Sequence, residues 1–357
     1  MRIKEFIRPL GVAEIPDFCD FEVAGISSNS KRVRKNFVFV AVKGAREDGA
    51  RFINEAIGRG AKLIIVHESS ASAACLGTKI PFIKVKDTRT CIAKLAAQFY
   101  GNPSLNMKVA GVTGTNGKTT ITYLIESLLS AAGFVPGVIG TINYRFCNKE
   151  IPSTNTTPGP VELQSMLSTM LKAGVDYTVM EVSSHALDQD RTLAVDFNSA
   201  IFTNLTQDHL DYHKTLKSYF ECKAKLFQNL SSQAFAVLNN DDPCGLRLAK
   251  MTKAEVITYG IRNSADITAR NIRFDCSHTE FELHTPSGSI DLKSRLIGRH
   301  NVYNLLASAA WGYKEGLGLE AIKSGLENFY NVPGRLEKVS MGRNYSVFVD
   351  YAHTEKE

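Results

Sequence analysis

The sequence predicts an α/β protein whose main domain has a mainly parallel sheet with helices on both faces. From Met107 to about Gly318, apolar runs that fit buried strands alternate with helical patterns. This order is typical of parallel sheets, because each crossover helix returns the chain to the same end of the sheet. The first hundred residues repeat the alternation on a smaller scale, which predicts a small N-terminal α/β domain.

In the main domain, strands are expected at 107–112, 136–140, 176–182, 198–202 and 234–238, with helices at 118–132, 161–173, 215–229 and 301–315. Short strands at 255–259, 267–274 and 280–284 predict an antiparallel extension of the sheet. In the first domain, strands are expected at 36–42, 63–66 and 82–85, with helices at 52–59 and 88–99.

Two breaks divide the chain into three parts. Gly101-Asn102-Pro103-Ser104 ends a first domain at 1–103, and Val332-Pro333-Gly334-Arg335 ends a central domain at 104–332. A strand at 345–350 follows, and the sequence stops at Glu357. A single strand is too little for a domain, so 333–357 is expected to be the start of a C-terminal domain that is mostly missing.

The stretch Gly111 to Thr120, Gly-Val-Thr-Gly-Thr-Asn-Gly-Lys-Thr-Thr, lies between an apolar strand and a helical pattern. Backbone N–H groups of such a turn converge on a phosphate, the helix N-terminus adds positive potential, and Lys118 adds a charge. Thr119 offers a hydroxyl for Mg²⁺. The glycines depart from the general P-loop spacing, because Val112 stands where that spacing has glycine. The stretch nevertheless predicts a nucleotide phosphate site.

Composition narrows the function class. The 357 residues are 44% hydrophobic and carry a net charge of +6, which fits an acidic substrate such as a nucleotide. No basic tract with aromatic platforms argues for nucleic acid. The seven cysteines form no CxxC pair and fit reduced thiols in a cytoplasmic protein. The first residues lack a signal-peptide core, and no apolar run approaches the ~20 residues of a membrane span.

Polar residues follow several of the predicted strands, where open α/β sheets bind ligands. Glu181 ends one strand and is placed to hold Mg²⁺, although an acid there could also cap a helix together with Ser183 and Ser184. Asn155-Thr156-Thr157 could bind a substrate phosphate or sugar, or cap the helix that follows. Arg191 could pair with a phosphate or lie on a solvated surface.

The segment 202–213 contains two histidines and two aspartates after another strand, which fits a metal or phosphate site or a plain turn. A nucleophilic pair of Ser183 or Ser184 with His185 or His209 is weakly supported, because no G-x-S-x-G elbow surrounds either serine. Lys223 lies in a predicted helix. A helix lysine ordinarily extends to water, but a neutral lysine near a metal can add CO₂ to give a carbamate ligand.

Taken together, these segments resemble the Mur ligase family. The resemblance runs through Asn29-Ser30-Lys31, 44–49, 113–120, 155–158, 181–191, 204–213, 223–227, 298–301 and 350–353. Asn-Thr-Thr-Pro and Glu-Val-Ser-Ser-His favour the members that add the third residue of the peptidoglycan stem peptide. These members are ATP-dependent amide-bond ligases that join a diamino acid, such as meso-diaminopimelate or L-lysine, to UDP-N-acetylmuramoyl-L-alanyl-D-glutamate through an acyl phosphate.

The resemblance also implies a role for individual residues. Lys118, Glu181, His209 and Lys223 would be catalytic, and Lys223 would be the carbamylated (N6-carboxy) lysine. Thr119 would hold one Mg²⁺, and Glu181, His209 and carbamylated Lys223 would hold a second Mg²⁺. ATP would be bound by Gly114, Thr115, Asn116, Gly117, Lys118, Thr119, Thr120, Asn301, Arg335 and Asp350. The uridine nucleotide and muramoyl dipeptide would be bound by Ser28, Ser30, Ala45, Arg46, Glu47, Asn155, Thr156, Thr157, Ser183, Gln189 and Arg191.

The chain departs from the family at two places. Asn29-Ser30-Lys31 replaces the usual Asp-Ser-Arg, which keeps the hydroxyl and the positive charge. The family continues after Tyr-Ala-His-Thr with proline and a Rossmann-like domain, whereas this sequence has Thr354-Glu355-Lys356-Glu357 and stops. We therefore expect a cytoplasmic monomer that binds its UDP-linked substrate but is inactive as the fragment given.

Three alternatives stay open from the sequence. The first is a sister Mur ligase or a folylpolyglutamate- or cyanophycin-type synthetase, which shares the Gly-Thr-Asn-Gly-Lys loop. The second is a P-loop GTPase or kinase switch, although no Asn-Lys-x-Asp motif is present. The third is an inactive nucleotide-binding fragment.

Overall fold

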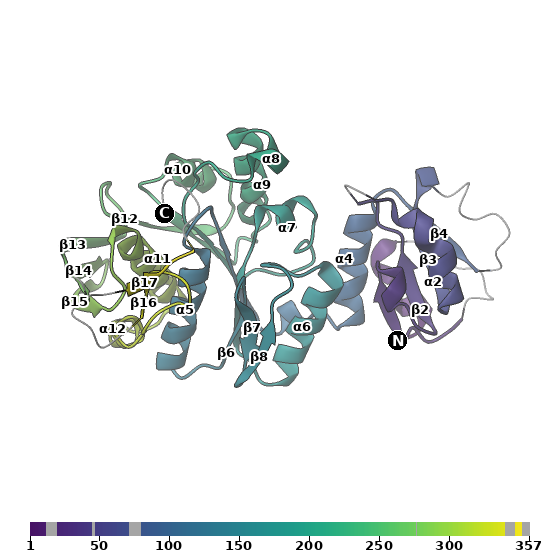
Figure 1. Ribbon diagram of the computed structural model, residues 1–357, viewed down its shortest axis with the longest axis horizontal. Helices are drawn as coiled ribbons and strands as arrows, with labels where there is room; N and C mark the ends of the chain where they lie inside the picture. Colours follow the sequence, from purple (N-terminus) through teal and green to yellow (C-terminus); the bar gives the residue numbers. More distant parts are fainter. Residues whose placement is uncertain (12–19, 45–46, 71–79, 276, 340–346, 352–357) are drawn as a thin grey trace. The chain divides into compact units, whose positions relative to one another are not determined.

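The structure, a computed structural model, describes residues 1–11, 20–44, 47–70, 80–275, 277–339 and 347–351. The chain forms two compact units (Figure 1). The first comprises Met1–Asn106, Pro158–Thr169 and Asp188–Val195, and the second comprises Met107–Thr157, Met170–Leu187 and Asp196–Glu357.

The first unit contains a four-stranded parallel sheet in the order β1-β2-β3-β4. Successive side chains of a strand point to opposite faces of the sheet, and here each face has its own hydrophobic core. Val38 and Leu63 belong to one core, and Phe39 and Ile64 belong to the other. The sequence did not predict β1, because three residues are too few to show a period. The elements are α1 Ile3–Phe6, β1 Gly25–Ser27, β2 Phe37–Val40, α2 Ile53–Gly58, β3 Ala61–His67, β4 Phe82–Val85 and α4 Thr88–Phe99.

The second unit contains an eleven-stranded sheet in the order β15-β14-β13-β12-β11-β10-β5-β9-β6-β7-β8. Neighbouring strands are parallel from β13 to β6, and antiparallel hairpins extend both edges. The strands are β5 Lys108–Thr113, β6 Pro136–Ile139, β7 Asn143–Phe146, β8 Lys149–Pro152, β9 Tyr177–Glu181, β10 Ser199–Phe202, β11 Phe235–Asn239, β12 Glu255–Gly260, β13 Ile267–Phe274, β14 Thr279–Thr285 and β15 Gly288–Ser294. The predicted mainly parallel sheet is confirmed. The predicted antiparallel extension is only partly right: β12 and β13 continue the parallel part of the sheet, and antiparallel pairing begins with β14.

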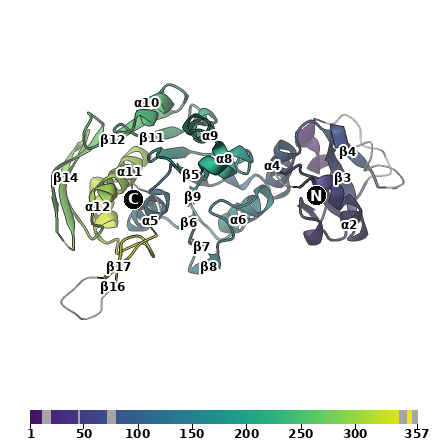
Figure 2. The same cartoon turned by 45° about the horizontal axis from the view of Figure 1, so that its top comes forward.

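Helices cover both faces of this sheet. On one face α5, α11 and α12 pack against one another (Figures 1 and 2), and Ile201 of β10 belongs to their core. The next residue, Phe202, points to the other face, where its ring lies 6.3 Å from that of Phe227 on α9. The helices are α5 Lys118–Ala131, α6 Pro160–Lys172, α7 Ser184–Asp188, α8 Leu210–His213, α9 Leu216–Gln228, α10 Pro243–Ala249, α11 Arg299–Glu315 and α12 Leu319–Glu327.

A two-stranded sheet of β16 Glu337–Val339 and β17 Val347–Val349 follows the second predicted break. The predicted strand at 345–350 corresponds to β17. Residues 345 and 346, the first two of the predicted strand, lie outside the described ranges. The proposed start of a third domain at 333–357 stays a prediction.

Candidate active site

The phosphate loop connects β5 at the centre of the sheet to α5, in the strand–turn–helix order that the sequence predicts. Its backbone needs glycine at two positions. Gly114 and Gly117 have φ of 149° and 89°, and a Cβ on them would lie 1.8 Å from Thr203 Oγ1 and 2.4 Å from Asn304 Oδ1. Lys118 begins α5, and its ammonium donates to the carbonyls of Gly114 (3.1 Å) and Thr115 (2.6 Å). The helix N-terminus and this ammonium give the loop positive potential.

The segment after β10 supports the phosphate loop from the neighbouring strand. Asn204 accepts hydrogen bonds from two loop N–H groups: its carbonyl from Thr115 (2.8 Å) and its Oδ1 from Asn116 (3.1 Å). In return, the Thr206 N–H donates to Thr115 Oγ1 at 3.0 Å. The two segments therefore hold each other's backbone in place.

Glu181 at the end of β9 is a buried carboxylate beside the phosphate loop, only 1% exposed. Its Oε1 accepts from the Thr119 hydroxyl (3.0 Å) and the Thr141 N–H (2.8 Å), and its Oε2 accepts from the Thr141 hydroxyl (3.0 Å). The hydroxyl and carboxylate oxygens of Thr119 and Glu181 are ligands that suit Mg²⁺. This pair therefore fits the divalent cation that the sequence predicts.

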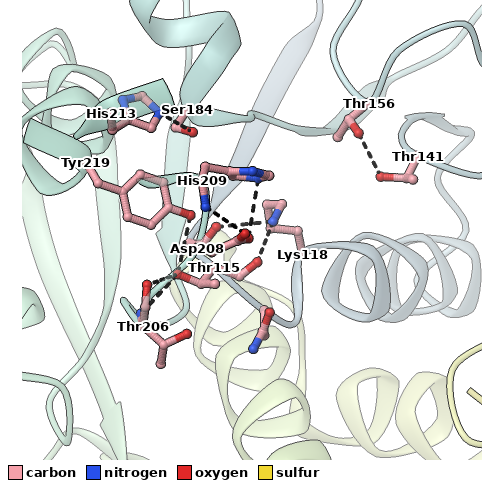
Figure 3. Close-up of polar contacts among 12 residues, drawn as sticks. Thr115, Lys118, Thr141, Thr156, Ser184, Thr206, Asp208, His209, His213 and Tyr219 are labelled. Carbon is pink, nitrogen blue, oxygen red and sulfur yellow. Dashed lines mark hydrogen bonds and ion pairs between the residues drawn. The ribbon is translucent and has the colours of Figure 1, made fainter. Parts of the chain in front are cut away.

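The Asn155–Thr157 segment approaches the same carboxylate. Thr156 Oγ1 lies 3.1 Å from Thr141 Oγ1 (Figure 3). Thr157 is buried, and its hydroxyl donates to the Glu181 carbonyl (2.8 Å) and accepts from the Ser183 N–H (3.0 Å). Helix α6 begins at Pro160, which agrees with the proline expected in its first turn, but Asn155, Thr156 and Thr157 lie too far before Pro160 to be its N-cap.

Ser183 serves as the cap of the short helix α7. Its hydroxyl accepts from the Ala186 N–H at 3.2 Å, the geometry of an N-cap. Ser184 Oγ lies 2.9 Å from His213 Nε2, and both residues are buried (Figure 3). This pairing differs from the weakly supported serine nucleophile with His185 or His209, and the burial of Ser184 does not suit attack on a substrate.

His209 lies at the start of α8 with a left-handed backbone, φ 53°. Both carboxylate oxygens of Asp208 contact His209. Asp208 Oδ1 accepts from the His209 backbone N–H (2.7 Å), and Asp208 Oδ2 lies 3.3 Å from His209 Nε2 (Figure 3). Burial and the nearby ammonium of Lys118 lower the pKa of His209, although Asp208 opposes the shift. The ring is therefore biased toward its neutral form, which is the form that binds metals.

Lys223 on α9 is 1% exposed and does not extend to water. Its ammonium nitrogen donates to the Gly114 carbonyl at 2.7 Å and lies 4.4 Å from the centre of the Tyr219 ring. Burial and then the charge of Lys118 hold the pKa of Lys223 well below its usual range. The site therefore favours a neutral amine, the form that reacts with CO₂.

A cavity of about 600 Å³ joins these elements in the second unit, within the size range of small-molecule sites. Predicted residues that line it are Thr115, Asn116, Gly117, Lys118, Thr119, Thr120, Thr156, Glu181, Ser183, His209, Asn301, Arg335 and Asp350. Gly114, Asn155, Thr157 and Lys223 are not among its lining residues. Lys223 instead contacts the phosphate loop from behind, through the Gly114 carbonyl.

Thr203, Asn204 and Asp208 line the cavity and belong to the segment 202–213, which the sequence analysis gave as a possible metal or phosphate site without assigning them roles. The sequence reasoning missed other residues that line this cavity, among them Thr141, Asn239, Asp241, Asp242, Arg262, Tyr303 and Asn304. For Asn239 to Asp242 a signal was available: this polar run directly follows a buried strand, β11, as Glu181 follows β9. The strand-end rule applied to Glu181 would have found them.

The remaining predicted residues belong to the first unit. Ser30 is buried and donates to Glu55 Oε2 at 2.7 Å, while Ser28 and Glu47 are exposed. Ala45 and Arg46 lie outside the described residues. Arg191 donates to Gln189 Oε1 through Nε (3.1 Å) and Nη2 (2.7 Å).

Within the described ranges, no group of three or more His, Cys, Asp or Glu side chains is arranged to hold a metal ion. The predicted magnesium ligands Thr119, Glu181, His209 and Lys223 include only two residues of these types, so this finding does not bear on them. Among the same residues, no helix is long and apolar enough to cross a membrane.

Comparisons with known proteins agree with this geometry. The profile of the Mur ligase middle domain matches residues 112–312, and that of the Mur ligase family catalytic domain matches residues 22–100. A UDP-N-acetylmuramoyl-L-alanyl-D-glutamate--2,6-diaminopimelate ligase of Geobacter metallireducens is 42% identical over 99% of this chain and 70% of its own length. The chain belongs to the Mur ligase family.

Other relatives of this Mur ligase are similar over the same span. A ligase of the same name from Clostridium tetani is 40% identical over 99% of this chain and 73% of its own length. A solved structure of a UDP-N-acetylmuramoyl-L-alanyl-D-glutamate--2,6-diaminopimelate ligase gives a TM-score of 0.84 at 28% identity, over 99% of this chain and 72% of that one. A MurF ligase from Thermotoga maritima in complex with ADP shares the fold at a TM-score of 0.62 and 23% identity, over 91% and 70% of the two chains.

Proposed function

We propose that this Mur ligase uses ATP to join a diamino acid to UDP-N-acetylmuramoyl-L-alanyl-D-glutamate, the step that adds the third residue of the peptidoglycan stem peptide. The observation that carries the proposal is one cavity lined by the phosphate loop, Glu181 and Thr156 in a chain of this family. The relatives named above are ligases for 2,6-diaminopimelate, which makes that diamino acid our first choice over L-lysine.

The proposed reaction has two steps. A carboxylate oxygen of the substrate attacks the γ-phosphorus of ATP, the bond to the bridging oxygen breaks, and ADP leaves. The amine of the diamino acid then attacks the carbonyl carbon of the acyl phosphate, loses a proton and expels phosphate. The first step brings two anions together, so catalysis depends mainly on positioning and charge neutralisation.

The residues around the phosphate loop suit these demands. Lys118 and the N-terminus of α5 would neutralise the phosphates, with Gly114 to Thr120, Asn301, Arg335 and Asp350 binding ATP. Thr119 would hold one Mg²⁺, and Glu181, His209 and a carbamylated Lys223 would hold a second Mg²⁺. When bound, these cations would supply positive charge that offsets the repulsion between the two anionic substrates. Asp208 would keep the His209 ring in place.

Each unit contains residues that we assign to the UDP-linked substrate. In the first unit we assign Ser28, Ser30 and the 45–47 turn to the uridine nucleotide, with Gln189 and Arg191 assigned to the dipeptide end. In the second unit we assign Asn155, Thr156, Thr157 and Ser183 to the dipeptide end; Thr156 and Ser183 line the cavity. We further propose that the protein is a cytoplasmic monomer.

A ligation assay tests the function. The full product of the gene, given ATP, Mg²⁺ and UDP-N-acetylmuramoyl-L-alanyl-D-glutamate, should release ADP when meso-diaminopimelate is added. L-Lysine, L-alanine and D-alanyl-D-alanine serve as competitors, and a folate serves as the alternative acceptor. ADP release that depends on L-alanine or D-alanyl-D-alanine, each offered with the UDP-linked acceptor of the corresponding sister ligase, would instead indicate a sister ligase. ADP release with the folate would indicate a folylpolyglutamate-type synthetase.

A further inference from the structure

The turn Asn239–Asp242 at the end of β11 contains an aspartate whose surroundings consist of hydrogen-bond donors. The Asp241 side chain is 2% exposed. Its Oδ2 accepts from the N–H groups of Ile261 (2.7 Å) and Arg262 (2.9 Å) and from the Tyr303 hydroxyl (2.8 Å), and its Oδ1 accepts from the Asn263 N–H (2.7 Å). Three of these donors lie in the β12–β13 connection and the fourth on α11.

This arrangement requires a carboxylate. An ionised carboxylate only accepts hydrogen bonds, whereas an asparagine in its place would direct an NH₂ group at one set of donors. Burial alone would raise the pKa of Asp241, but the four hydrogen bonds outweigh it and lower the pKa below its usual range. Asp241 is therefore a buried anion with satisfied oxygens, which fixes the 261–263 backbone and the Tyr303 ring relative to β11.

The neighbours of Asp241 connect the same turn to the phosphate loop. The Asn239 amide donates to the Thr203 carbonyl (2.8 Å), and Asp242 Oδ2 accepts from the Leu205 N–H (2.8 Å). Both contacts hold the segment after β10 that supports Thr115 and Asn116. The turn therefore holds two walls of one cavity, since Asp241, Arg262 and Tyr303 line it together with the phosphate loop.

We propose that Asp241 is a positioning residue for the nucleotide: it fixes the 261–263 turn and Tyr303 as the wall that orients the nucleoside while the phosphate loop holds the phosphates. The inference rests on the proposed function, because it takes ATP as the occupant of the cavity. Asp241 acts through Arg262, Tyr303 and the turn between them. Its loss should therefore weaken nucleoside orientation more than phosphate binding.

The test compares Asp241→Asn with the wild-type protein in the full gene product. The KM for ATP should rise about 10- to 100-fold, the range expected when buried hydrogen bonds to a charge are lost. The value of kcat should change less than about threefold, because the interactions with the transferred phosphoryl group remain. Inorganic triphosphate, measured as a competitor of ATP, should bind both proteins equally.

The matched control is Asp266→Asn. Asp266 lies in the same connection and accepts from the Thr258 N–H (2.8 Å) and hydroxyl (2.6 Å), but it does not line the cavity. The KM of the Asp266→Asn variant for ATP should equal that of the wild-type protein. If Asp241→Asn does not fold, judged by loss of its thermal unfolding transition, Asp241→Glu replaces it, because this variant keeps the charge but displaces both oxygens.

An unchanged KM for ATP in the folded variant, or an equal loss of ATP and triphosphate affinity, would overturn the inference. Failure of the proposed function and failure of the positioning role can be told apart. If the wild-type protein itself does not bind ATP, the proposed function fails and this inference with it. If the wild-type protein binds ATP and the folded Asp241 variant binds it equally well, only the positioning role fails.

Discussion

Replacing Lys118 with alanine is expected to abolish ADP release in the full gene product, with a loss in kcat/KM of at least about 10³-fold. The Lys118 ammonium is part of the phosphate loop and now bonds the Gly114 and Thr115 carbonyls. On nucleotide binding it would exchange these carbonyls for phosphate oxygens. Arg262 and Arg335 also line the cavity, but neither belongs to the phosphate loop, so the variant removes the loop's own side-chain charge.

Lys217→Ala is the matched control for this experiment. Lys217 lies on α9 with 80% of its side chain exposed, and its recorded ion pair is with Glu221 one turn away. Its removal should leave ADP release unchanged. Near-normal turnover by folded Lys118→Ala would reject the phosphate role of the loop lysine, whatever the behaviour of the control.

The second large effect is expected at Lys223. Lys223→Ala should abolish ligation, and a small carboxylic acid such as acetate or propionate at high concentration should restore part of it. The reason is chemical: the lysine amine adds CO₂ and loses a proton to become a carbamate, and alanine leaves a space in which a free carboxylate can supply similar oxygens. The buried position of Lys223 and its lowered pKa support this role.

Comparing several acids shows whether Lys223 acts as a metal ligand or only as a packing residue. Formate, acetate and propionate differ in length, so rescue should depend on the acid, and chloride at equal ionic strength should give none. The acids should leave Lys217→Ala unaffected. If no acid restores activity to folded Lys223→Ala, the carbamate assignment is wrong.

Strong periodicity explains which parts of the fold could be predicted. β13 and α4 were predicted at their observed bounds, Ile267–Phe274 and Thr88–Phe99. Helix α4 carries a helical pattern of apolar residues along its length, and in β13 apolar residues alternate on each side of a register shift between Arg270 and Arg273. In contrast, β8 is exposed along its whole length and presents no apolar face. It forms only because β7 offers it a partner edge, which a local pattern does not reveal.

The same contrast between local signals and long-range contacts explains which site residues could be predicted. The phosphate loop was predicted because its chemistry is local: strand, glycines, lysine and helix are consecutive. The burial of Lys223 was not derivable, because its helix also carries lysines that reach solvent, such as Lys217. Asp241 was missed because the strand-end rule was not applied to β11. Its positioning role was not derivable from the sequence, because its donors come from residues about 20 and 60 positions away.

The central claim is that ATP activates a substrate carboxylate as an acyl phosphate, and isotope transfer tests it most directly. UDP-N-acetylmuramoyl-L-alanyl-D-glutamate is labelled with ¹⁸O in the reacting carboxylate and turned over by the full gene product with ATP and meso-diaminopimelate. The carboxylate oxygen that attacks the γ-phosphorus leaves with it, so the released phosphate should carry one ¹⁸O atom per turnover. Phosphate that contains no ¹⁸O while the amide product accumulates would contradict the account.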